Sequence, residues 1–431
     1  MRKVQHSVRT LGNGLRVVVV PQPWLSRAHV ALYARTGSRY EDKKTNGLSH
    51  FLEHMLYRGT PRLPTAHDVN YAVEEVGGYL YAVTQVDFGV FSVTLPPESL
   101  EPATVLFGEI LLQPTFADIA LEQQIVCEEI LEDLDDDGRQ VDADNLSRAL
   151  IYPKHPLGFG IVGTQDLVRA FDEPMLRAHH ARHYGARSSV LVFSGDVDAE
   201  RAFSLAERAF GAMPPGRKVV ATPPEHTQKK ARLKMVESMA SQTELRVCFR
   251  APSEASPERP VIDVLMRLLD DGMSTRLYHR LVDDKGLLYD VSASYDGYED
   301  DGVIDFAASC VHERTTAVTA QILALLAELG REGPSEEELA KAKRRNEWEA
   351  RFMLDSVEET ASFFAGGLLF DRFTLPWDRV AENARVTSEQ IREVARELAR
   401  PERLNVVAVG LLEEDGEGEA LRALVKGYAG V

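Results

Sequence analysis

The chain has 431 residues, of which 44% are hydrophobic and 27% are charged, a composition typical of a globular protein. At this length a single hydrophobic core is not sufficient, so we expect two or more domains. The formal net charge of −18, from 67 acidic and 49 basic residues, disfavours nucleic acid, whose phosphates would be repelled. The same charge is compatible with basic peptides as substrates.

The N-terminal segment contains one apolar run, the four valines at 17–20, and the motif Gly12-Asn13-Gly14 before it predicts a hairpin turn. This run is too short for a secretion signal and far too short to span a membrane. No later stretch reaches membrane length, and the three cysteines are too widely spaced to indicate a disulfide framework. We therefore expect a cytoplasmic protein with reduced thiols and no membrane span.

The segment 47–60, GLSHFLEHMLYRGT, predicts an amphipathic helix with two contrasting faces. Its apolar residues recur at helical spacing and form one stripe. At about 100° per residue, His50, Glu53 and His54 fall together on the opposite face. Two imidazoles one turn apart can bind one metal ion, and the order His-x-x-Glu-His is the pattern of the inverted zincins. The alternative is a solvated polar face with two incidental histidines.

Residues 81–95, YAVTQVDFGVFSVTL, alternate with a period of two and predict paired strands. The next helix, at 119–134, offers a third metal ligand, because catalytic zinc needs three protein ligands and one open position. Glu122 and Glu129 lie two turns apart, within about 20° of each other on one face. Geometry alone does not choose among Glu129 and its neighbours Glu128 and Glu132, and all three could be solvated.

A proline-rich segment with a basic cluster, at 213–235, divides the chain almost in half and predicts an extended linker. The segments on either side are similar: a glycine after an acidic helix end, two alternating strands, a long apolar helix and an acidic helix. We therefore predict an α+β fold of two homologous domains, 1–216 and 233–431, joined by a linker at 217–232. Each domain would be a mostly antiparallel sheet with helices packed on it.

The second half lacks the metal motif. Matching Gly59 to Gly272 places Asp263, Met266 and Arg267 at the positions of the two histidines and the glutamate between them. Histidines that were needed only by the fold would be expected in both copies. Their absence from the second copy favours a function in the first.

These motifs resemble the pitrilysin family of zinc peptidases, which includes mitochondrial processing peptidase and insulin-degrading enzyme. The resemblance begins with His-x-x-Glu-His and the later pair Glu122 and Glu129, and it extends over nearly the whole chain. Further blocks that resemble the family are VGGYLYAVT, EQQIVCEEI, HPLGFGIVGT, ARHYGARSSVLVFSGDVD and GMSTRLYHRLVDDKGLLYDVSASY. The length is similar to that of the subfamily whose two-repeat chains pair to enclose a chamber, so each chain would form half of a clam-shell.

The resemblance implies roles for individual residues in the hydrolysis of peptides. His50, His54 and Glu129 would bind one Zn²⁺ per chain, and Glu53 would be the general base. Glu122 would orient one of the metal ligands. The chain would therefore be a zinc metalloendopeptidase.

The resemblance also implies that the strand with Tyr81, Ala82 and Thr84 binds the substrate main chain by adding it to the sheet. Tyr81 is a departure, because the family more often has asparagine at this position, and this departure concerns substrate orientation. His179 and His183 are also one turn apart, but no glutamate lies between them. They are therefore not predicted to bind the metal.

A second departure concerns an arginine and a tyrosine that the family supplies from the second half, seven residues apart. Tyr289 stands at the tyrosine position and would be catalytic, whereas Val282 stands at the arginine position. Arg280 would lie about 200° away around a helix and is a poor substitute. In paired members of the family, one subunit can carry the zinc motif and its partner the Arg-Tyr pair.

We therefore expect the metal-bearing subunit of a heterodimer, whose homologous partner carries the Arg-Tyr pair. An active homodimer is the first alternative. A non-catalytic scaffold, similar to the core subunits of the respiratory cytochrome complex that resemble this family, is the second. A structural protein without a metal is the third. The retained Glu53 and metal ligands favour the enzyme.

Overall fold

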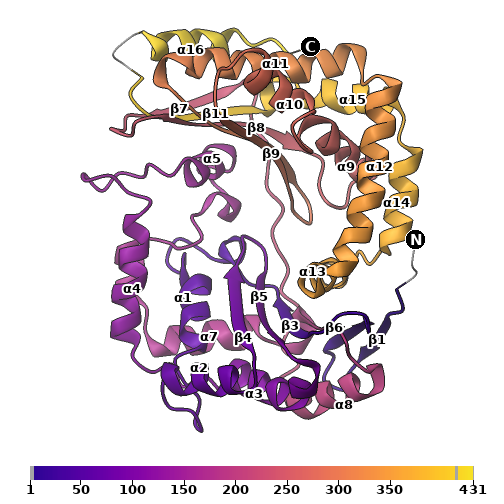
Figure 1. The fold of residues 1–431 in the computed structure, drawn as a ribbon. Coiled ribbons are helices and arrows are strands. Elements are labelled where there is room, and N and C mark those ends of the chain that lie inside the picture. Colours follow the sequence, from indigo (N-terminus) through magenta and orange to yellow (C-terminus); the bar gives the residue numbers. More distant parts are fainter. Residues whose placement is uncertain (1–3, 413–415, 431) are drawn as a thin grey trace. The chain divides into compact units, whose positions relative to one another are not determined.

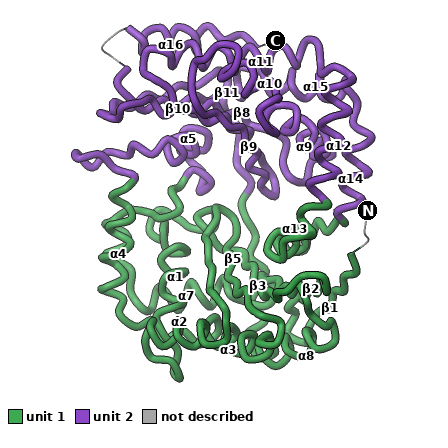
Figure 2. The backbone as a smooth tube through the Cα atoms, in the orientation of Figure 1, with its two compact units in different colours: residues 1–132, 159–222, 351–375 green, residues 133–158, 223–350, 376–431 purple. Residues whose placement is uncertain are grey.

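The structure is a computed structural model, and it describes residues 4–412 and 416–430. Helices and strands are mixed along the chain (Figure 1), which forms two compact units (Figure 2). Unit 1 comprises residues 1–132, 159–222 and 351–375, and unit 2 comprises 133–158, 223–350 and 376–431. No helix within the described residues is long and apolar enough to cross a membrane.

Unit 1 contains a six-stranded sheet in the order β1-β2-β6-β3-β5-β4. All neighbouring strands are antiparallel except β2 and β6, which are parallel. The valine run forms the buried part of β2, and the predicted hairpin turn before it joins β1 to β2. The strands are β1 (Ser7–Thr10), β2 (Arg16–Pro21), β3 (Ala28–Ala34), β4 (Tyr79–Thr84), β5 (Gly89–Leu95) and β6 (Ser189–Gly195).

Unit 2 contains a five-stranded sheet in the order β7-β11-β8-β10-β9, with one parallel pair, β7 and β11. The other pairs are antiparallel. This order repeats that of β2-β6-β3-β5-β4 in unit 1, so the predicted α+β fold with two similar, mostly antiparallel sheets is confirmed. The strands are β7 (Arg232–Val236), β8 (Thr243–Ala251), β9 (Asp290–Gly297), β10 (Gly302–Cys310) and β11 (Leu404–Val409).

Helices pack on both sheets. In unit 1 they are α1 (Leu48–Leu56), α2 (Ala66–Glu75), α3 (Leu100–Leu112), α4 (Ile119–Leu131), α6 (Gln165–Ala170), α7 (Glu173–His183), α8 (Ala199–Phe210) and α13 (Val357–Leu369). Those of unit 2 are α5 (Ala143–Ile151), α9 (Arg259–Leu269), α10 (Arg276–Tyr278), α11 (Thr315–Glu332), α12 (Glu336–Phe352), α14 (Pro376–Arg385), α15 (Ser388–Leu398) and α16 (Glu417–Gly427). The core of unit 2 lies between its sheet and the apolar faces of α9, α11 and α15.

Two helices are exchanged between the halves of the sequence. Helix α5 belongs to the first half but packs on β8 and β11 of unit 2, whereas α13 from the second half packs on β3 and β6 of unit 1. The units are therefore discontinuous in sequence. Residues 217–229 contain no helix or strand, and the division into 1–216, 217–232 and 233–431 stays a prediction about the sequence repeat.

Candidate metal centre

Helix α1 carries the His-x-x-Glu-His residues, and its opposite face anchors it in the core of unit 1. The apolar stripe predicted from the sequence is buried, and the ring of Phe51 lies 5.7 Å from that of Phe171. His50 is also buried, at 8% exposure, whereas Glu53 and His54 are half-buried. The polar face is therefore held at the edge of the core, where a ligand can reach it.

The start of α1 is held by a buried carboxylate that sequence reasoning missed. Gly47, which precedes the helix, has no side chain to cap it, and Glu41 instead accepts hydrogen bonds from the backbone N–H groups of Gly47 (2.8 Å) and Ser49 (2.7 Å). Burial raises the pKa of Glu41, and these hydrogen bonds oppose the increase. The available signal was an acidic residue shortly before a helix that lacks a capping side chain.

His179 and His183 lie behind α1 as a buried pair, with ring centroids 4.3 Å apart. Nε2 of His179 is 3.0 Å from Oγ of Ser49, and Nδ1 of His183 is 2.8 Å from the backbone oxygen of Arg35. Burial lowers the pKa of both histidines, that of His183 to about 4. Burial thus favours the neutral form of both imidazoles, and His179 contacts the helix through Ser49.

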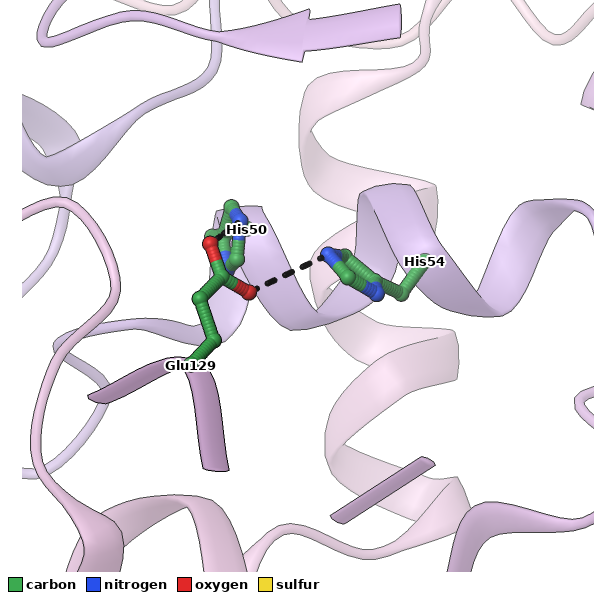
Figure 3. A group of neighbouring side chains, drawn as sticks. All are labelled: His50, His54 and Glu129. Atoms are coloured by element: carbon green, nitrogen blue, oxygen red, sulfur yellow. Dashed lines mark ion pairs between the residues drawn. The ribbon is translucent and has the colours of Figure 1, made fainter. Parts of the chain in front are cut away.

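The structure brings His50, His54 and Glu129 together (Figure 3). Nε2 of His50 lies 3.4 Å from Oε1 of Glu129, and Nε2 of His54 lies 3.7 Å from Oε2. One ligand atom from each residue lies within 4.8 Å of the others. A tetrahedral zinc site with bonds of about 2.1 Å has ligand separations of about 3.4 Å, so this donor set fits Zn²⁺.

Helix α4 settles which glutamate joins the histidines. Glu128 on α4 and Glu132, directly after the helix, are exposed, whereas Glu129 faces α1. The hydrogen bond from His50 lowers the pKa of Glu129, and the charge of His54 lowers it further. Of the three alternatives that the spacing left open, only Glu129 is placed to share a ligand with both imidazoles.

Glu122 lies on the buried side of α4 and orients the side chain of His54. Its buried carboxylate accepts a hydrogen bond of 2.8 Å from Nδ1 of His54 and is also paired with Arg58. This contact leaves Nε2 of His54 free to face Glu129, an arrangement typical of the partners of metal-binding histidines. Burial alone would lower the pKa of His54, but the hydrogen bond and charge of Glu122 outweigh it and raise the pKa. Sequence reasoning missed Arg58, which together with His54 lowers the pKa of Glu122 against the effect of burial.

Thr84, the last residue of β4, holds the side chain of Glu53 in place. The hydroxyl of Thr84 donates a hydrogen bond to Oε2 of Glu53. Among the residues that the structure describes, β4 is an edge strand that pairs only with β5. Tyr81 on this strand is 53% exposed, and Ala82 is half-buried. One edge of its backbone is thus open to an added strand, and the role of these three residues in substrate binding stays a prediction.

The residues of the second half of the chain that the family resemblance singled out lie in unit 2. Tyr289 stands just before β9 and is 91% exposed. Val282 is half-buried against the core of unit 2, in a π-helical segment, His279–Asp284. Arg280 is engaged in an ion pair with Glu328. The catalytic role of Tyr289 and the consequence of Val282 at the arginine position stay predictions.

Removing Glu41 tests its support of α1. We expect Glu41→Ala to lower the free energy of unfolding by about 1–3 kcal/mol, because two buried backbone N–H groups lose their acceptor. The matched control is Lys43→Ala, an exposed neighbour. Urea denaturation of both variants measures the difference. Equal stability of the two would show that Glu41 does not hold the helix start.

Comparisons with known proteins identify the family. The family described as "Insulinase (Peptidase family M16)" matches residues 16–165, and that described as "Peptidase M16 inactive domain" matches residues 170–346. The chain therefore belongs to peptidase family M16, and the predicted membership of the pitrilysin family is confirmed.

Similar proteins are named as zinc proteases. The chain is 32% identical over 340 residues to an uncharacterized zinc protease of Mycobacterium tuberculosis, covering 78% of this chain and 77% of that protein. It is 28% identical over 359 residues to the uncharacterized zinc protease YmxG of Bacillus subtilis, covering 82% and 85%.

Solved structures share the fold. A protease from Helicobacter pylori has a TM-score of 0.87 and 23% identity, covering 94% of this chain and 99% of that one. A structure described as a peptidase M16 inactive domain, from Pseudomonas fluorescens, has a TM-score of 0.86 and 20% identity, covering 95% and 98%. At these identities the likeness concerns the fold alone.

Proposed function

We propose that this chain is a zinc metalloendopeptidase in which His50, His54 and Glu129 bind one Zn²⁺. The observation that carries the proposal is the convergence of these three side chains, from two helices, at separations that suit a tetrahedral ion. Membership of a peptidase family and relatives named as zinc proteases support it.

When bound, Zn²⁺ supplies Lewis-acid activation of water and of the peptide carbonyl. The residues of the chain then do the rest. Glu53 accepts a proton from the attacking water and delivers it to the leaving amine. Thr84 restricts the Glu53 carboxylate to one orientation through its hydrogen bond. Glu122 fixes the ring of His54, and Arg58 maintains the charge of Glu122.

The substrates we propose are peptides or unfolded segments bound in extended form. Strand β4 offers an open sheet edge beside Glu53, to which a peptide main chain can add by hydrogen bonding. The net charge of −18 favours basic peptides through long-range attraction.

A non-catalytic subunit is the second candidate. It is favoured by Val282 at the arginine position and by the match of the second half to a domain described as inactive. The intact ligand cluster and Glu53 favour the enzyme, because a scaffold has no use for a general base beside a metal site.

The glutamates of α4 provide a direct test. We expect Glu129→Gln to lower the zinc content well below one ion per chain and to reduce cleavage of a fluorogenic peptide, because the amide is a much weaker zinc ligand. The matched control, Glu128→Gln, changes an exposed neighbour and should retain both properties. Full zinc in Glu129→Gln would remove this residue from the metal site and contradict the proposed function.

We also propose that the chain works with a homologous partner that carries the Arg-Tyr pair. The half-buried Val282 cannot donate a hydrogen bond to a developing oxyanion, and one such donor contributes about 2.7–4 kcal/mol. The isolated chain is therefore expected to cleave peptides slowly, and a homologous chain with the pair should raise turnover by about two orders of magnitude or more. Turnover by the purified chain, with and without that protein, measures the effect. Full activity of the chain alone would contradict the heterodimer.

A further inference from the structure

A basic groove lies on unit 2 between β7 and α16, with a volume of about 570 Å³. We define it by its four cationic side chains, Lys230, Lys234, Arg422 and Lys426. The basic cluster that the sequence places in the linker thus continues onto the C-terminal helix. No carboxylate is among the described residues that line the groove, although the chain as a whole carries a net charge of −18.

Within residues 4–412 and 416–430, no carboxylate balances the charge of the four cations. In the part of the chain that the structure describes, none of them forms an ion pair with a carboxylate, whereas other basic residues of unit 2, such as Arg276 and Arg345, are paired. One possible role of lysines on an edge strand is simply to prevent that edge from pairing with the edge of another sheet. That explanation covers Lys234, but it does not account for Lys230, which precedes the strand, or for Arg422 and Lys426, which come from a helix.

The groove also offers features that a peptide needs. Strand β7 ends the sheet and, in the described part of the chain, pairs only with β11, so no described strand occupies the other side of its backbone. Figure 1 shows α16 packed beside this strand. Leu233 and Met235 are half-buried, and they lie with Val425 and Tyr428 in the lining of the groove. An extended chain at this position would find backbone donors and acceptors, apolar contacts and positive charge together.

We propose that the basic groove binds an acidic, extended segment of a partner polypeptide, which adds to β7 as a further strand. Because side chains alternate between the two faces of a strand, acidic side chains on one face of the segment pair with Lys234. Side chains on the other face, where Leu233 and Met235 lie, meet the apolar and cationic residues of α16. Nucleic acid is the less favoured ligand, because it does not complete a sheet edge and the net charge of the chain repels it. The proposal uses residues of unit 2 alone and does not depend on the metal site.

The test uses the full-length chain with Glu53→Gln, which prevents cleavage of the probe. The probe is a short fluorescein-labelled peptide of alternating glutamate and valine, followed by fluorescence anisotropy. We expect saturable binding that weakens as salt is added. The double variant Lys234→Glu/Lys426→Glu should weaken it at least tenfold. Lys154→Glu/Arg344→Glu makes the same change of charge at exposed positions of unit 2 outside the groove and should bind normally.

Two further probes separate the alternatives without changing the protein. A peptide of the same sequence with every second backbone amide methylated should bind at least tenfold more weakly, because it cannot complete a strand pair. Equal binding would mean attraction by charge alone and would overturn strand addition. Duplex DNA or phosphatidylserine vesicles that bind through the same cations more tightly than the peptide would also overturn the proposal, as would equal binding by both double variants.

Discussion

Glu53→Gln is expected to lower kcat for peptide cleavage at least about a hundredfold, the lower end of what general-base catalysis contributes. The amide has nearly the same shape as the carboxylate and can still accept the hydrogen bond from Thr84, but it cannot take a proton from water. Because Glu53 is not among the three clustered ligands, zinc content should not change. Initial rates with a fluorogenic peptide and elemental analysis of the same samples measure both quantities.

The control for this variant is Glu74→Gln, which changes an exposed glutamate on α2 and should retain full activity. Near-native turnover of Glu53→Gln would assign the general base to another residue. Loss of zinc together with activity would instead mean that Glu53 acts as a ligand, and the mechanism would have to be rewritten around that role.

The double variant His50→Ala/His54→Ala is expected to bind no zinc, whereas the unmodified chain should bind about one ion. In the proposed site each imidazole supplies one of three ligand atoms, and Glu129 alone would not hold the ion against water. Peptide cleavage should be lost with the metal. Elemental analysis after dialysis, combined with circular dichroism to confirm folding, measures the effect.

His67→Ala is the matched control, since it removes an exposed histidine from α2. It should retain zinc and activity. A double variant of His50 and His54 that keeps a full ion would place the metal elsewhere in the chain, and the cluster in Figure 3 would then be a hydrogen-bonded structural feature.

The polar face of α1 could be predicted from the sequence because it depends on local geometry. Residues one turn apart must share a helix face, so His50, Glu53 and His54 were grouped before any fold was known. The same holds for the fold class, since the alternation of the strands and the helical periodicity are local patterns. The blocks that resemble the family supplied Glu129 as the expected third ligand.

Other parts of the site depend on contacts between residues distant in sequence, about which local patterns carry no information. Spacing left Glu128, Glu129 and Glu132 equivalent, and only the packing of α4 on α1 turns Glu129 towards the imidazoles. Glu41 and Arg58 were missed for the same reason, because their partners are defined by how the loop and helices pack.

What the sequence by itself determined is therefore the helix face that carries His50, Glu53 and His54, the α+β class and the family. The tertiary structure alone decided that α5 and α13 each cover the sheet that belongs to the other half of the chain. It also decided that the basic residues of the linker meet those of α16 in one groove. The physical reason is that a helix buries its apolar face against whichever surface completes a core, and amphipathic periodicity specifies the face but not the surface.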